Sequence, residues 1–294
     1  MLPVRQCDVY HPHAGIAAEA VANGHLKYEG PIMQLISQTA NRMNRRRQRF
    51  AAVERSLLTG EQPPIVLCLS RYVRQGLDSH YAMDPSHIAI LFNAIDLARF
   101  DPEARPDTGH EVRRRFGIAA DRVVALLMAQ DFHRKGLAQA IGAIAKVKDD
   151  RLTLLVAGKQ DPASYMRLAE REGVAGRIIF AGEAREPHAF YRAADLFVLP
   201  TRHDPCSLVV LEALAMGLPV ISTRFNGACE IMETGRHGIV LPDPADVSAL
   251  ADALRKLLND ATRKEMAAHC IALRSQLAYD RHLDELLRIY AAPL

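Results

Sequence analysis

The sequence predicts an α/β protein with parallel sheets, because short β-branched apolar runs alternate with longer helical patterns. Its 294 residues, of which 49% are hydrophobic and 24% charged, suit a globular chain of roughly two domains. The alternation is regular from Arg122 onward and sparse before residue 100. We therefore expect one complete domain and one incomplete domain.

Residues 117–275 are predicted to form the complete domain, which is doubly wound. Buried strands are expected at 123–129, 152–158, 177–182, 195–200 and 218–223, with a sixth candidate at 239–242. Helical patterns at 136–148, 162–173 and 206–216 fit between these strands. Open sheets of this kind bind ligands at the carboxyl ends of their strands.

Residues 1–116 are predicted to form only part of a domain. Strand character is confined to 7–12, 65–70 and 87–92, and a long helical pattern fills 31–58. Since such a sheet normally has about five or six strands, a segment is expected to be missing from the front. Turn formers and charges at 94–118 predict the connection to the second domain. Residues 276–294 are expected to form a helix that packs back on the N-terminal part.

Composition excludes several classes of protein. A net charge of +3 is too mild to indicate nucleic acid by itself. Five scattered cysteines without a CxxC pair favour reduced thiols over a disulfide or zinc framework. No apolar run reaches the roughly 18 residues of a membrane span, and the first residues lack the apolar region of a signal peptide. The expected location is the cytoplasm.

A basic run at 41–50 carries five arginines. One hypothesis is a helix face that contacts anionic lipid at the inner side of a membrane, and the other is a solvated face. RNA binding is disfavoured because no aromatic ladder accompanies the arginines.

The stretch 204–219, DPCSLVVLEALAMGLP, is the most informative part of the sequence. A loop enters an apolar helix there, so unpaired backbone N–H groups and the positive dipole end are expected to gather, which favours anion binding. The residues at this helix start are Cys206, Ser207 and Leu208. A diphosphate bound at these N–H groups and a ribose bound to Glu212 would together be parts of one nucleotide. Asp204 has two open roles, a ligand or a helix N-cap, and a reactive thiol at Cys206 is the less favoured role of that residue.

Two neighbouring cations, Arg134 and Lys135, follow a predicted strand and precede Gly136. They could hold a diphosphate and stabilise its charge as it leaves. The alternative is a pair of solvated loop charges.

Several motifs together resemble the retaining family-four glycosyltransferases. ILFNAIDLARFDPE at 90–103 is similar to their interdomain segment, and DFHRKGLAQAIGAIAKV at 131–147 is similar to their phosphate-binding loop and helix. Residues 180–232 look like the donor half of their site, and the likeness extends to lipopolysaccharide-core glucosyltransferases. The resemblance implies a glycosyltransferase B fold of two facing Rossmann-like domains, with acceptor on the first, nucleotide sugar on the second, and no metal.

Carried over to this sequence, the resemblance implies a nucleotide-sugar site on the second domain. The base is expected near Gly182 to Arg185, the ribose on Glu212, and the phosphates on Arg134, Lys135 and residues 206–208. The family's Glu-x7-Glu is Asp204-x7-Glu212 here, and its common arginine five residues before the loop lysine is Gln130. The resemblance also implies that roughly the first hundred residues of the N-terminal domain are absent.

His11 and His13 lie at the end of the first predicted strand, in YHPHAG. By the resemblance His11 lies near the transferred sugar, whereas a structural turn is the alternative. A metal pair is disfavoured because no third ligand is in view. Asn226, Gly227 and Glu230 resemble the family's "G-G-x-x-E" loop, and a turn at a helix start is favoured over direct ligand contact.

The predicted activity is transfer of a hexosyl group from a nucleotide diphospho-sugar, UDP being the favoured carrier, to a glycan or glycolipid. Catalytic roles are assigned to His11, Arg134, Lys135, Asp204 and Glu212. Retention of configuration is implied by the resemblance alone. Two alternatives stay open: a noncatalytic nucleotide-sugar-binding remnant, and an epimerase of the same fold.

Overall fold

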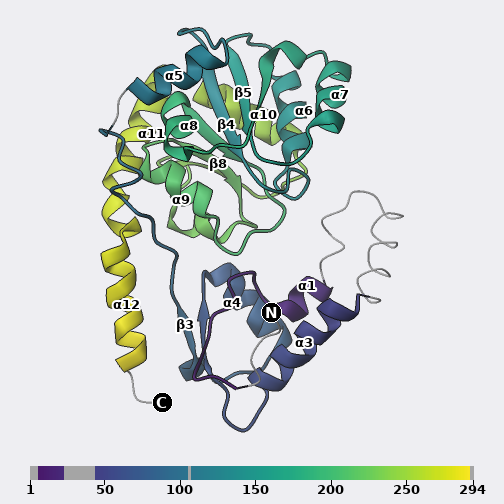
Figure 1. Ribbon diagram of the computed structural model, residues 1–294, viewed down its shortest axis with the longest axis vertical. Coiled ribbons are helices and arrows are strands. Elements are labelled where there is room, and N and C mark those ends of the chain that lie inside the picture. The colour runs from purple at the N-terminus through teal and green to yellow at the C-terminus, as the bar shows by residue number, and fades with distance from the viewer. Residues whose placement is uncertain (1–5, 23–43, 105–106, 292–294) are drawn as a thin grey trace.

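The computed structural model describes residues 6–22, 44–104 and 107–291. Its larger part is a six-stranded sheet with helices around it (Figure 1). The strand order is β6-β5-β4-β7-β8-β9, and every pairing is parallel. The strands are β4 (Val123–Met128), β5 (Leu152–Ala157), β6 (Ile178–Gly182), β7 (Leu196–Leu199), β8 (Val220–Thr223) and β9 (Gly238–Leu241). In chain order this is 3-2-1-4-5-6, the doubly wound arrangement, so the predicted strands are confirmed, including the sixth.

The sequence pattern explains these strands. Every residue of β4, β5, β7 and β8 is buried, as expected where helices cover both faces of a parallel sheet. Helix α6 packs against α7 and α10, whereas α9 packs against α11. The helices are α6 (Leu137–Lys146), α7 (Ala163–Arg171), α8 (Pro187–Ala193), α9 (Leu208–Ala215), α10 (Val247–Leu257) and α11 (Asp260–Ala272).

The described N-terminal part is a three-stranded parallel sheet in the order β1-β2-β3. It consists of β1 (Val9–Tyr10), α1 (Ala17–Ala22), α3 (Arg45–Leu58), β2 (Ile65–Cys68), α4 (Arg71–His80) and β3 (Ile88–Ile90). The three predicted strands are confirmed. Helix α3 begins after the N-cap Asn44, whose side chain accepts a hydrogen bond from the Arg47 N–H. The earlier part of the predicted helix 31–58, up to residue 43, lies outside the described residues.

The predicted connection at 94–118 contains a helix, α5 (Asp107–Arg115), that the turn-rich sequence did not indicate. This helix packs against α8. Arg113 donates to the Asp195 carboxylate at 2.7 Å and to the Ala193 carbonyl at 2.8 Å. A Cβ on Gly109 would lie 2.7 Å from the Arg192 carbonyl oxygen, so close contact requires glycine there. Tertiary contacts therefore stabilise a helix of weak intrinsic propensity.

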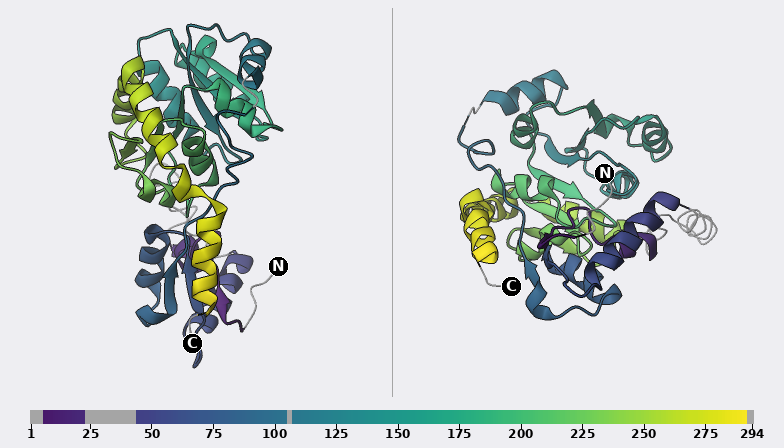
Figure 2. Two further views of the ribbon diagram at one scale, coloured as in Figure 1. Left: turned by 90° about the vertical axis from the view of Figure 1, so that its left-hand side faces the viewer. Right: turned by 60° about the horizontal axis from the view of Figure 1, so that its bottom comes forward.

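The last helix, α12 (Tyr279–Ala291), runs beside the segment that leaves β3 (Figure 2). Ile95 N–H donates to the Leu277 carbonyl at 2.7 Å, and Arg281 donates to the carbonyls of Phe92 and Asn93. The C-terminal segment thus lies against the connection between the two parts of the molecule. In the part of the chain that the structure describes, no helix is long and apolar enough to span a bilayer.

Candidate functional site

The order of strands in the large sheet reverses between β4 and β7, and the loops that follow these two strands meet there. Arg202 N–H donates to the Arg134 carbonyl at 3.0 Å, which joins the two loops. Gly136 has a φ of 78°, and a Cβ there would lie 2.3 Å from the Pro200 carbonyl oxygen. Only glycine allows this approach. Such a reversal point is where open α/β sheets bind ligands.

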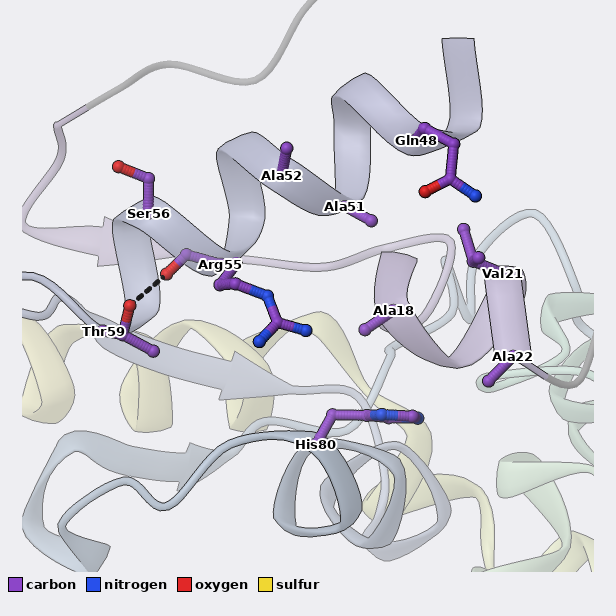
Figure 3. Close-up of a pocket in the computed structure, with 10 residues that line it drawn as sticks. All are labelled: Ala18, Val21, Ala22, Gln48, Ala51, Ala52, Arg55, Ser56, Thr59 and His80. Atoms are coloured by element: carbon purple, nitrogen blue, oxygen red, sulfur yellow. Dashed lines mark hydrogen bonds between the residues drawn. The ribbon is translucent and has the colours of Figure 1, made fainter. Parts of the chain in front are cut away.

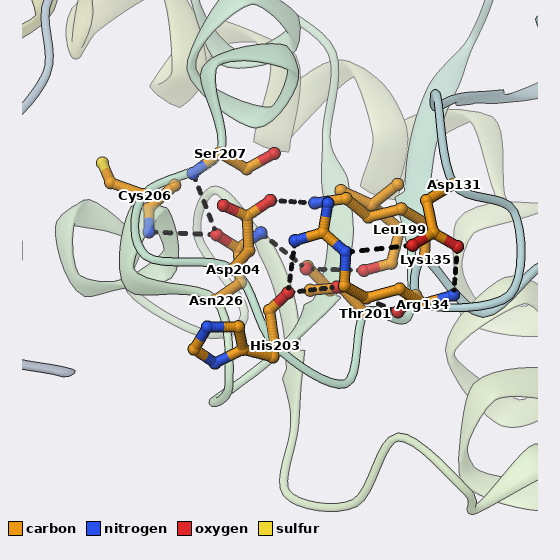
Figure 4. Close-up of polar contacts among 12 residues, drawn as sticks. Asp131, Arg134, Lys135, Leu199, Thr201, His203, Asp204, Cys206, Ser207 and Asn226 are labelled. Carbon is orange, nitrogen blue, oxygen red and sulfur yellow. Dashed lines mark hydrogen bonds and ion pairs between the residues drawn. The ribbon is translucent and has the colours of Figure 1, made fainter. Parts of the chain in front are cut away.

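Lys135 and Asp204 form a buried ion pair at this point (Figure 4). Each residue is only 8% exposed. Burial lowers the pKa of Lys135, and the Asp204 carboxylate opposes this effect. The N-cap of α9 is Ser207, so the hypothesis that Asp204 caps this helix is wrong. Because Lys135 is buried, its ammonium needs an anionic partner. An anion that displaced Asp204 could fill that role.

Arg134 lies next to this pair with part of its side chain exposed. Its backbone N–H donates to Asp131 Oδ1 at 3.0 Å, and its Nε lies 3.4 Å from Asp131 Oδ2. The side chain is 35% exposed, so a ligand can reach the guanidinium. The structure therefore brings the two predicted phosphate-binding cations together on one loop.

The start of α9 differs from the prediction in one respect. Ser207 N–H, expected to be unpaired, donates to Asn226 Oδ1 at 3.2 Å. This N–H is already satisfied because the Asn226 side chain folds back over the helix start, where it also caps η3 (Gly227–Ile231). The helix-start role favoured for Asn226 is thereby confirmed. The Cys206 carbonyl accepts from Asn93 Nδ2 at 3.0 Å, and the exposed Leu208 follows as the first residue of α9.

Cys206 does not have the environment of a reactive thiol. Its side chain is buried, and burial raises its pKa to about 12. A thiol with that pKa is protonated at neutral pH and is a poor nucleophile.

Glu212 lies further along α9 and faces α8. It accepts a hydrogen bond from the hydroxyl of the fully buried Tyr191 at 2.7 Å. Burial raises the pKa of Glu212, while Tyr191 and then Arg99 oppose the shift. No contact within the described residues joins Glu212 to Lys135 or Asp204, so the structure places the two predicted acids in separate environments.

The predicted base-binding residues lie on the far side of β5 from the ion pair. Gly182 ends β6, has a φ of 72°, and its carbonyl accepts from Gly158 N–H at 2.8 Å. Arg185 follows in the loop before α8. The strand ends of β6 and β4 are two strand spacings apart, or about 10 Å. This separation is comparable to that between the base and the diphosphate of a nucleotide.

His11 and His13 lie on the N-terminal side of the interface, in the loop after β1. Their ring centroids are 3.9 Å apart. Burial, together with the nearby His13 and His282, lowers the pKa of His11 to about 4. His11 Nε2 is buried and has no hydrogen-bond partner in the described protein. A Cβ on Gly15, at the end of this loop, would lie 3.4 Å from Pro205, so the loop abuts the Asp204 loop.

Glu54 holds this loop in place from α3. Its buried carboxylate accepts hydrogen bonds from the hydroxyls of Tyr10 and Tyr81 and from the N–H groups of Ala17 and Ala18. A single carboxylate therefore joins β1, the start of α1, α3 and the residue that ends α4. The sequence analysis did not single out Glu54, because a lone glutamate in an arginine-rich helix carries no motif.

Three further interface contacts were also missed. Tyr72 OH lies 2.6 Å from His203 Nδ1, and Ser70 Oγ donates to the Pro205 carbonyl at 2.6 Å. The Glu230 carboxylate accepts from the N–H groups of Arg71 and Tyr72 at 2.8 and 2.7 Å. Ser70 followed by an amphipathic helix was a visible N-cap signal, but its second partner is 135 residues away in sequence.

One cavity lies at this interface and another lies within the N-terminal part. One, of about 830 Å³, lies between the parts of the molecule, and its lining includes Tyr72, His203 and Arg134. The other, of about 580 Å³, lies between α1 and α3, and its lining includes four alanines together with Arg55 and His80 (Figure 3). Among residues 6–22, 44–104 and 107–291, no three His, Cys, Asp or Glu side chains gather closely enough to hold a metal ion.

Comparison with known proteins agrees with this geometry. Residues 122–260 match the family model of glycosyl transferases group 1. The chain is 27% identical to the lipopolysaccharide glucosyltransferase WaaG of Escherichia coli strain K12 over 223 residues, which cover 75% of this chain and 60% of that protein.

Solved structures give the same result at the level of the fold. The crystal structure of WaaG superimposes with a TM-score of 0.79 and 25% identity, over 96% of this chain and 75% of that one. Anabaena Alr3699/HepE in complex with UDP has a TM-score of 0.76 and 18% identity, over 96% and 71% of the two chains.

The fold and its interdomain site define a protein of the glycosyltransferase B class. Within that class, residues 122–260 form a domain of the group 1 glycosyl transferases. The matched region covers 60% of the length of the curated relative named above.

Proposed function

We propose that this protein transfers a hexosyl group from a nucleotide diphospho-sugar, with UDP as the carrier, to a glycan or glycolipid acceptor with retention of configuration. The observation that carries the proposal is the buried Lys135–Asp204 pair beside Arg134, at the point where the strand order of a doubly wound sheet reverses. This is where such sheets bind nucleotides, and two adjacent cations match the charge of a diphosphate.

The donor would lie along the carboxyl edge of the large sheet. Its base occupies the region of Gly182 to Arg185, its ribose hydroxyls donate to Glu212, and its diphosphate lies on Arg134 and Lys135. Tyr191 donates a hydrogen bond to one carboxylate oxygen of Glu212. Because Glu212 is largely buried, loss of a hydrogen bond from the ribose would carry a free-energy cost. The HepE relative has been solved with UDP and with UDP-glucose, which supports this class of donor.

Chemistry would begin when the diphosphate draws the Lys135 ammonium away from Asp204. The freed Asp204 carboxylate then accepts a hydroxyl of the transferred sugar. The acceptor hydroxyl attacks the anomeric carbon from the face of the leaving diphosphate, and its proton passes to a diphosphate oxygen. Arg134 and Lys135 stabilise the charge that grows on the leaving group. His11, neutral at physiological pH because its pKa is about 4, can offer a hydrogen bond to the sugar without adding charge.

The likeness to the lipopolysaccharide glucosyltransferase WaaG supports a role in lipopolysaccharide synthesis. We also propose that the reaction takes place at the inner face of the membrane, without a metal ion or nucleic acid as partner. The exposed arginines of α3, Arg45, Arg46 and Arg49, would supply the peripheral contact with anionic lipid.

Calorimetry with UDP and UDP-glucose, together with release of UDP in a transfer assay, tests the proposal. Glu212→Gln should weaken both ligands roughly tenfold, the loss expected for one charge-assisted hydrogen bond. Asp204→Asn should weaken UDP-glucose but leave UDP binding equal or tighter, since it releases Lys135 for the diphosphate. Absence of binding to either ligand would refute the proposal, and binding without transfer or hydrolysis would favour a noncatalytic nucleotide-sugar-binding protein.

A further inference from the structure

The interdomain cavity of about 830 Å³ is lined by three arginines besides the one assigned to the donor diphosphate. Four arginines line it: Arg47 from α3, and Arg134, Arg202 and Arg224 from the loops after β4, β7 and β8. Arg134 belongs to the proposed donor site. The positive charge continues past it along the carboxyl edge of the sheet, toward β8 and away from the predicted base site at β6.

Three acidic residues also line this cavity, and each has a partner within the protein. Glu19 pairs with His80 at 2.8 Å, and Asp131 pairs with Arg134. Asp243 accepts from the N–H of Ala245 at 2.8 Å. Arg224, in contrast, is exposed and makes no ion pair with any residue that the structure describes. Its guanidinium lies 5.0 Å from the centre of the Phe225 ring, which orients it at the edge of the cavity.

The wall beside Arg224 suits a sugar. Phe225, Pro242 and Pro244 line it and offer flat apolar surface to the C–H faces of a pyranose ring. The guanidinium of an arginine matches the oxygens of a phosphate or carboxylate. An apolar wall beside Arg224 therefore suits a sugar that carries an anionic group.

We propose that Arg224, with Arg202 beside it, binds an anionic group carried by the acceptor, so that the protein selects phosphorylated or acidic sugars over neutral ones. This inference rests on the proposed function, because it places the acceptor beyond the donor diphosphate. It assigns to the loops after β7 and β8 a part in acceptor choice that is separate from donor binding.

Saturation-transfer NMR tests the proposal on the whole chain with its donor site filled by saturating UDP. Glucose 6-phosphate, glucuronate and glucose serve as probes. We expect glucose 6-phosphate or glucuronate to bind about tenfold more tightly than glucose, the ratio typical of a charge-assisted contact. A preference for the first assigns a phosphate and a preference for the second a carboxylate, and either supports the proposal.

Arg224→Gln should remove that preference while leaving UDP affinity within twofold of wild type. Arg167→Gln is the matched control, because Arg167 is an exposed arginine on α7 that makes no ion pair with a described residue. Equal binding of all three sugars, or equal behaviour of the two variants, would overturn the inference. So would glucose 6-phosphate that binds without UDP but not when UDP fills the donor site. Failure of the wild-type protein to bind UDP would instead count against the donor site itself.

Discussion

Lys135 combines a buried ion pair with a proposed role in binding the donor diphosphate. Its ammonium is buried against Asp204, so removal of either member leaves a buried charge without compensation. Arg134 lies on the same loop but is 35% exposed, and its partner Asp131 is 47% exposed. The two cations should therefore share an effect on donor binding and differ in their effect on folding.

We expect Arg134→Ala and Lys135→Ala each to weaken UDP binding by about 1.5–3 kcal/mol, the usual loss of a charge-assisted hydrogen bond. Lys135→Ala should in addition lower the free energy of unfolding by about 3 kcal/mol. Calorimetry and urea denaturation measure the two effects. The double variant Lys135→Ala/Asp204→Ala is the control and should regain much of the stability. Unchanged UDP affinity in Arg134→Ala would contradict the phosphate assignment.

His11 predicts a dependence of stability on pH. Its folded-state pKa of about 4 lies below the ordinary value of 6.5. Between these values the unfolded chain binds a proton that the folded chain does not, so stability is complete above about pH 6.5 and falls as the pH drops toward 4.

In His11→Gln the loss of unfolding free energy between pH 7 and pH 4.5 should be smaller by about 1 kcal/mol, a value reduced for the partial exposure of the ring. Urea denaturation at several pH values measures it. His110→Gln, an exposed histidine on α5, is the control and should keep the wild-type slope. A slope in His11→Gln as steep as in wild type would show that the ring is protonated in the folded protein.

At the scale of elements, α5 marks where the second domain begins. The sequence analysis began that domain at residue 117, after α5, because turn formers and charges at 94–118 predicted a connection there. In the structure α5 packs against α8, and Arg113 pairs with Asp195, which also accepts from Val124 N–H at 2.7 Å. The helix thus supports the start of β4 and belongs with the large sheet.

A fragment 107–277 should accordingly fold and bind UDP, whereas 117–277 should be less stable by about 3 kcal/mol or more, since it loses the buried Val112 and leaves Asp195 without its cation. Urea denaturation of the two fragments checks this. Equal stability would place the boundary after α5, as the sequence indicated.

At the scale of the whole molecule, the N-terminal part contacts the second domain at the loop 203–206, which carries Asp204, and at η3. Ser70 reaches Pro205, Tyr72 reaches His203, and Asn93 reaches Cys206. Glu230 places its carboxylate at the start of α4, where it accepts two backbone N–H bonds and opposes the positive end of the helix dipole. Three of these contacts end on residues 203–206. A movement of one domain relative to the other would therefore displace the loop that carries Asp204, which belongs to the proposed donor site.

Glu230→Ala should remove both acceptors, so amide exchange in a peptide covering residues 69–75 should speed up about tenfold, as expected for the loss of roughly 1.4 kcal/mol of local protection. Hydrogen exchange followed by mass spectrometry measures it. Glu233→Ala, a nearby glutamate that pairs only with Arg236 among the described salt bridges, should leave this peptide unchanged. Equal exchange in the two variants would mean that Glu230 does not hold α4.

The sequence by itself determined the doubly wound domain and the two neighbouring cations in the loop after β4. Apolar β-branched runs identify strands that are buried on both faces, and Arg134-Lys135-Gly136 is local in the chain, so neither requires knowledge of distant contacts. The strand order then fixes where the loops after β4 and β7 must meet.

Only the tertiary structure decided the partners of the remaining residues. Asp204 could have been a helix cap or a ligand, and the Lys135 ammonium, 69 residues away, made it an ion-pair partner. The Ser207 N–H, expected to be unpaired, donates to Asn226, and Glu212 accepts a hydrogen bond from Tyr191. Residues 107–115 form a helix because they pack against α8. Periodicity reports which face of an element is apolar, but a buried polar group is satisfied by whatever the folded chain brings within hydrogen-bond distance, and that depends on the whole fold.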